Sequence, residues 1–178
     1  VLKALHHEQP DRTPADFQAV SEIWERLKNH FHTEDMKEIL DQLEIDCAWV
    51  DPEVLRTADQ KDENGYLTGW GGSRLRYVYN RFGAHEEIVK YAADDCATIS
   101  EIDAALILPD LNKCDFTSVT QACSRYDDRF LIGGFASSFY YPTLVRNMED
   151  LLADLILEPA LARHLIKRCF AWHMDYHE

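Results

Sequence analysis

The stretch Arg129-Phe-Leu-Ile-Gly-Gly-Phe135 decides the fold class, because it is the most strand-like segment of the chain. A short apolar run of this kind predicts a buried strand. Ile45-Asp-Cys-Ala-Trp-Val50 has the same character and ends at Asp51-Pro52, and Arg12 to Phe17 is a third, extended candidate. Helical stretches separate these segments, so we expect the strands to pair in parallel with helices outside them.

The segments between the strands carry helical signals. Residues 20–30 hold apolar side chains at helical spacing, and Thr33 is the expected N-cap of the next helix. Thr98 and Glu101 form the sequence of a capping box. Further helices are expected over Thr117 to Arg125, after the N-cap Asn147, and from Pro159 onward.

The order of elements favours an α/β fold, a partial TIM (β/α)8 barrel with an inserted β-hairpin over Tyr66 to Asn80. A complete barrel uses about 250 residues and more strands than are visible here. We therefore expect residues 1–178 to be the N-terminal part of a single barrel domain, and we expect its C-terminal half to be absent from this sequence. A Rossmann-like sheet is the alternative, but no G-x-G-x-x-G follows a strand, and Gly133-Gly134 lies inside one.

The amino-acid composition bears on the partners and the compartment of the protein. The 178 residues carry a net charge of -14, and such an acidic surface disfavours nucleic acid and membrane surfaces as partners. The five cysteines contain no C-x-x-C pair and indicate reduced thiols, as in the cytoplasm. No apolar run approaches the roughly 18 residues of a membrane span, and the first residues of the sequence do not show the basic stretch followed by an apolar one that is typical of a secretory signal.

Candidate site residues follow the three expected strands, because catalytic groups of barrels collect at the carboxyl ends of strands. Asp51 can orient a cationic or N–H-bearing substrate, or it can be an Asp-Pro turn that ends a strand. The loop after the third strand can hold a ligand between small and aromatic residues, or it can be a tight turn. The expected pocket residues outside Asp51 are Asp16, Phe17, Phe135, Ala136, Ser137, Phe139 and Tyr140.

Three residues near the end of the chain are candidate metal ligands. Cys169, His173 and His177 follow one another at intervals of four, so neighbouring members share a helix face. The stripe drifts around the helix, and Cys169 lies beside apolar Leu165 and Ile166. Packing or solvent exposure is the favoured interpretation.

Several motifs in order resemble one known family. Ala4-Leu-His-His-Glu-Gln-Pro-Asp-Arg-Thr-Pro14 resembles its entry sequence, and Leu43 to Asp51 resembles its second strand. Trp70-Gly71 resembles a W-G in its methyltransferase-like branch, Phe130 to Ala136 its "l-i-g-f-a-g" strand, and Asn147 to Pro159 its helix pair. The whole chain thus resembles the N-terminal half of the uroporphyrinogen decarboxylase-like superfamily, which includes corrinoid-linked methyltransferases.

This resemblance implies an enzyme, either a methyltransferase or a decarboxylase (lyase) of porphyrin metabolism. The decarboxylases have Arg-Gln-Ala-Gly-Arg where this chain has Asp16-Phe-Gln-Ala-Val20, without the two arginines that hold substrate carboxylates. We therefore expect methyl transfer between a small substrate and a corrinoid, with a corrinoid protein as partner and zinc ligands in the C-terminal half. Asp51 would correspond to the decarboxylase's key aspartate, and Tyr140 lies near the place of its tyrosine. Tetrapyrrole decarboxylation and a non-catalytic corrinoid- or partner-binding domain remain the alternatives.

Overall fold

The computed structural model describes residues 1–51, 53–54, 61–81, 83–134 and 137–177. The chain divides into two compact units, which are described separately. Unit 1 comprises Val1–Glu53 and Asp115–Gly134, and unit 2 comprises Val54–Cys114 and Phe135–Glu178. The short strands β2 (Glu53–Val54) and β6 (Cys114–Asp115) lie at the boundaries between them.

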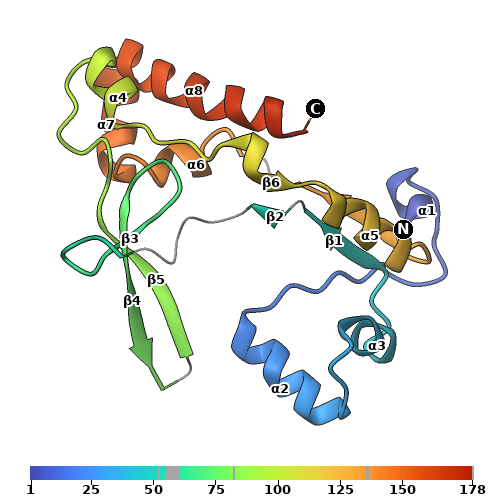
Figure 1. Cartoon of the computed structure of the whole chain (residues 1–178). Coiled ribbons are helices and arrows are strands. Elements are labelled where there is room, and N and C mark those ends of the chain that lie inside the picture. Colours follow the sequence, from blue (N-terminus) through green and yellow to red (C-terminus); the bar gives the residue numbers. More distant parts are fainter. Residues whose placement is uncertain (52, 55–60, 82, 135–136, 178) are drawn as a thin grey trace. The chain divides into compact units, whose positions relative to one another are not determined.

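Unit 1 is built on a parallel pair of strands, β1 (Cys47–Val50) and β7 (Phe130–Gly133). Cys47 lies opposite Phe130 and Val50 opposite Gly133, so both strands end at the same edge. The parallel pairing expected between these two segments is confirmed. The helices of unit 1 are α1 (Leu2–Leu5), α2 (Ser21–Phe31), α3 (Met36–Gln42) and α5 (Thr117–Arg125) (Figure 1).

The start of α3 differs from the expected one. Asp35 is the N-cap, and its Oδ1 accepts a hydrogen bond from Lys37 N at 2.7 Å. Thr33 stands two residues earlier, where its Oγ1 accepts a hydrogen bond from Asp35 N at 3.1 Å and donates one to Glu38. Both residue types are good caps, so local sequence alone did not separate them.

The strand β7 is shorter and less buried than the sequence indicates. It ends at Gly133, and its side chains are half-buried or exposed. The buried residues of this strand pair come from β1, namely Cys47, Ala48 and Val50. Among the described residues β7 pairs only with β1, and a strand with a single neighbour keeps more of its surface in water.

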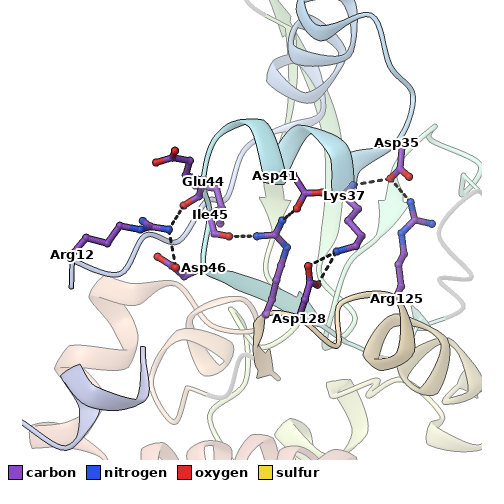
Figure 2. A network of polar contacts seen from close by, with 10 residues as sticks. Arg12, Asp35, Lys37, Asp41, Glu44, Ile45, Asp46, Arg125 and Asp128 are labelled. Atoms are coloured by element: carbon purple, nitrogen blue, oxygen red, sulfur yellow. Dashed lines mark hydrogen bonds and ion pairs between the residues drawn. The ribbon is translucent and has the colours of Figure 1, made fainter. Parts of the chain in front are cut away.

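Figure 2 shows the polar network that joins α3 to the segment between α5 and β7. Lys37 Nζ donates to both carboxylate oxygens of Asp128 at 2.6 and 2.7 Å, and this bond lowers the pKa of Asp128. The buried guanidinium of Arg129 donates to the carbonyl of Ile45, just before β1. The other ion pairs of the network are Asp35 with Arg125, Asp41 with Arg129, and Asp46 with Arg12. Most of these groups are exposed, so the network orients α3 more than it stabilises the unit.

Unit 2 combines an antiparallel sheet with a group of helices. Its strands are β3 (Leu67–Thr68), β4 (Arg74–Asn80) and β5 (Gly83–Lys90), in the order β3-β4-β5. The inserted hairpin is therefore present, but its second long strand extends to Lys90, well beyond the expected end at Asn80. The helices are α4 (Ile99–Ala105), α6 (Tyr140–Thr143), α7 (Met148–Leu157) and α8 (Pro159–His177), and Leu111–Lys113 form a 3-10 turn.

The helices of unit 2 enclose its core. α8, the long red helix of Figure 1, packs against α4, α6 and α7. The capping box of Thr98 and Glu101 is formed at the start of α4, and Asn147 Oδ1 caps α7 by accepting from Glu149 N at 2.9 Å. The fully or nearly fully buried side chains of the core are Ala93, Ile102, Leu106, Val145, Leu151, Leu161, Ala162, Leu165 and Cys169.

The fold class is thus mixed α/β, with a small parallel sheet in one unit and an antiparallel sheet in the other. The strands of the described residues form no closed barrel. The expected parallel pairing of two apolar strands is confirmed by β1 and β7, whereas the third strand expected over Arg12 to Phe17 is not formed, since these residues belong to no strand.

Candidate functional site

The carboxyl edge of the β1–β7 pair carries Asp51, the first of the expected site residues. Asp51 is exposed, and its Oδ1 accepts a hydrogen bond from Gly134 N at 2.8 Å. Since Asp51 follows β1 and Gly134 follows β7, this bond joins the two strand ends. The second carboxylate oxygen of Asp51 has no partner among the described residues and stays available to a ligand.

Asp16 and Phe17 lie in an extended segment beside β1. Asp46 N donates to Ala15 O at 2.9 Å, and Ala15 N donates to Asp46 Oδ2 at 2.8 Å. The Asp16 carboxylate accepts from Trp49 Nε1 at 3.0 and 3.1 Å. Asp16 is thereby held to a β1 side chain.

The ring of Phe17 is the second fixed group of this segment. It meets Trp24 edge to face, with ring centroids 5.2 Å apart. The described contacts of Phe17 are therefore those of a packed side chain.

The residues expected after the third strand belong to unit 2. Ser137 Oγ accepts from Tyr140 N at 3.0 Å and so fixes the turn into α6. Phe139 and Tyr140 are 39% and 48% exposed, a state compatible with ligand contact. Phe135 and Ala136 lie outside the described residues. Asp16, Phe17 and Asp51 belong to unit 1, so the expected residues are distributed over the two units.

An aromatic cluster around His173 was not expected from the sequence. The His173 ring stacks on Trp70 at 5.8 Å, lies 3.8 Å from the ring of Tyr141, and meets Trp172 edge to face at 4.9 Å, all measured between centroids. The spacing of aromatic residues along α8 could have indicated part of this cluster. Trp70 and Tyr141 are distant in sequence, however, so only the tertiary structure reveals it.

His173 is an unusual group within this cluster. It is only 3% exposed, and neither ring nitrogen has a hydrogen-bond partner within the described part of the chain; Trp70 Nε1 is likewise buried without a partner there. Burial, with a smaller contribution from neighbouring His177, lowers the pKa of His173 and keeps the imidazole neutral. Buried polar atoms without partners are rare in native proteins, so this cluster is a second place where a small polar ligand or a water molecule would gain hydrogen bonds.

The described residues do not fit a zinc site. They contain no group of three histidine, cysteine or acidic side chains arranged to hold a metal ion. Burial raises the pKa of Cys169 to about 12, so this thiol stays protonated, whereas zinc binds the thiolate. The preference for packing over metal binding agrees with the burial of Cys169 and His173.

Within the described ranges, no helix has both the length and the apolar character that a bilayer crossing requires.

Comparison with known proteins finds no matching family model, no matching curated protein and no matching solved structure. The function must therefore be argued from the residues and their geometry.

Proposed function

We propose that this chain is part of an α/β-barrel enzyme of the uroporphyrinogen decarboxylase-like kind, which transfers a methyl group between a small substrate and a corrinoid carrier. The observation that supports it best is the position of Asp51 at the carboxyl edge of a parallel strand pair. In α/β barrels this edge carries the catalytic groups. The barrel itself is part of the proposal.

Asp51 would act by holding the substrate. The bond from Gly134 N fixes Oδ1, so the carboxylate cannot rotate freely and Oδ2 points its lone pairs in a set direction. A substrate ammonium or N–H group bound there would be oriented toward the methyl donor, and orientation of this kind lowers the activation barrier.

The corrinoid enters this proposal as the methyl-donating substrate. The chain's own contribution is binding and orientation, with Asp51 as the central residue.

Arg12 favours methyl transfer over tetrapyrrole decarboxylation. A porphyrinogen needs free cations for its carboxylates, and Arg12 is the arginine nearest to the segment where the decarboxylases carry two. Its Nη2 is already bound to Asp46 Oδ1 at 2.9 Å and to Glu44 O at 2.8 Å. An arginine neutralised in this way is a poor anchor for a polyanionic substrate.

The test supplies a small thiol that carries an ammonium group as the methyl acceptor, and it measures loss of methylcobalamin by its visible absorbance in the full-length protein, with coproporphyrin formation from uroporphyrinogen followed in parallel. Asp51→Asn should lower kcat/KM about 10- to 100-fold, because one charge-assisted hydrogen bond is worth about 1.5 to 3 kcal/mol. Asp127→Asn is the matched control, since Asp127 is also an exposed aspartate of unit 1.

The outcomes separate the three functions. Methylcobalamin turnover that depends on Asp51 supports the proposal. Coproporphyrin formation without methylcobalamin turnover would replace it by decarboxylation. Binding of methylcobalamin without either reaction would indicate a non-catalytic corrinoid-binding domain.

A further inference from the structure

The outer face of α8 carries two parallel ridges of side chains. The residues that α8 buries in the core of unit 2 are Leu161, Ala162, Leu165, Cys169 and His173. At 3.6 residues per turn, Ile166, Phe170 and Met174 form a ridge that runs beside this buried stripe. Lys167, Ala171 and Asp175 form the neighbouring ridge, and these six residues with Ser138 line an open groove of about 700 Å³.

This groove is apolar at its centre and exposed to solvent. Phe170 and Met174 are each 47% exposed, far more than the inner residues of the same helix. Neighbouring residues set four apart form the ridges that interlock in the commonest class of helix packing. The small Ala171 lies at the middle of its ridge and allows a second helix to approach closely.

The two charges at the ends of the second ridge have opposite signs. Lys167 and Asp175 lie four residues on either side of Ala171, and neither forms an ion pair with another described residue. A two-fold axis through Ala171 makes the partner helix run in the opposite direction. Lys167 of each copy then lies opposite Asp175 of the other copy, which gives two ion pairs. The apolar ridge centred on Phe170 is brought against itself by the same axis. Self-complementarity of this kind is what an isologous dimer interface requires.

We propose that this outer face of α8, defined by Ile166, Lys167, Phe170, Ala171, Met174 and Asp175, docks a second copy of the chain in an antiparallel two-fold dimer. A single helix face buries less area than a standard interface, so the dimer is in a concentration-dependent equilibrium with the monomer. This inference is independent of the methyl-transfer proposal.

The test is a charge swap followed by sedimentation velocity over a dilution series of the full chain. The buffer contains 0.15 M salt, where a screening length of about 8 Å suppresses the net repulsion between two acidic copies but preserves contact pairs. Lys167→Glu alone and Asp175→Lys alone each place like charges opposite one another and should yield monomer. The double variant K167E/D175K restores both pairs and should restore the dimer.

Two further variants complete the experiment. Phe170→Asp should yield monomer with an unchanged circular dichroism spectrum, because Phe170 is exposed and outside the core. Lys113→Glu, which changes the net charge as Lys167→Glu does but lies on the 3-10 turn, should leave the dimer intact. A monomeric parent chain would overturn the proposal, as would self-association that persists in both single reversals and in Phe170→Asp, since it would then arise at another surface.

Discussion

Replacing Asp154 by asparagine should destabilise unit 2 strongly, because the change leaves a buried positive charge without its partner. Asp154 and Arg146 are 7% and 9% exposed, and Arg146 Nε lies 2.5 Å from Asp154 Oδ2. Asparagine has nearly the same shape as aspartate, so the substitution removes the charge and little else.

The size of the destabilisation depends on the hydrogen bonds that Arg146 keeps in the Asp154→Asn variant. Breaking a buried ion pair by removing one partner costs about 3 to 5 kcal/mol. Arg146 Nη1 still donates to Ala93 O at 2.6 Å and Cys96 O at 3.1 Å, so two acceptors continue to compensate part of its charge. We therefore expect a loss near the lower end, about 3 kcal/mol. With an m-value of about 2 kcal/mol/M, the urea midpoint would fall by about 1.5 M.

The assay is urea unfolding followed by tryptophan fluorescence, since Trp70 and Trp172 both lie in unit 2. Asp150→Asn is the control on the same helix. Asp150 is exposed in the first turn of α7, where loss of its charge costs about 0.3 to 1 kcal/mol. A shift for Asp154→Asn no larger than that of Asp150→Asn would refute the reasoning.

A double-mutant cycle provides a second check on the same pair. Arg146→Met and Asp154→Leu should each destabilise the unit, whereas the double variant should lose less than the sum, because neither charge is then left buried alone. Additive losses would mean that the two side chains do not interact in the folded chain.

Three further outcomes are expected. Gly71→Ala should lower the free energy of unfolding by about 2 to 4 kcal/mol, because a Cβ there would lie 2.3 Å from Val145 Cγ2 and the φ of Gly71 is +74°. Gly65 also has a positive φ but no atom near the place of a Cβ, so Gly65→Ala should destabilise the chain less in the same urea assay. The pKa of His173 is lower in the folded chain than in the unfolded chain, so as the pH falls the unfolded chain takes up this proton at a higher pH. The free energy of unfolding should therefore decrease as the pH drops below about 6.5. Unfolding measured from pH 8 to 5 should show a smaller decrease for His173→Phe. Cys169, whose pKa burial raises to about 12, should resist iodoacetamide in the native chain and react in urea; equal labelling in both states by mass spectrometry would contradict its burial.

Local signals in the sequence located most helices correctly. The capping box of Thr98 and Glu101, the cap Asn147 and the opening residue Pro159 each involve groups within one helical turn. Such interactions need no distant partner, so the sequence displays them directly. The expected cap of α3, Thr33, was wrong: Asp35 caps this helix, since both residue types can cap and the surrounding contacts decide between them.

The strands were harder to read because their environment determines their character. The hairpin was expected to end at Asn80, but β5 continues to Lys90 with charged Glu86 and Glu87 within it. Most of β5 is exposed, so its sequence lacks the alternation that marks a half-buried strand. The opposite error concerns β7: its apolar residues predicted a buried core strand, but its side chains are only partly covered, because β1 is its single strand neighbour among the described residues.

The sequence by itself determined the positions of most helices, though not of the short α1 and α6, the parallel character of β1 and β7, and Asp51 as a residue at a strand end. Only the tertiary structure decided what these residues contact: Asp51 meets Gly134 N, Asp16 meets Trp49, and His173 is enclosed by Trp70 and Tyr141. The physical reason is range. Helix caps and apolar periodicity act over a few residues, whereas burial and its effect on the pKa of His173 depend on side chains that only folding brings together.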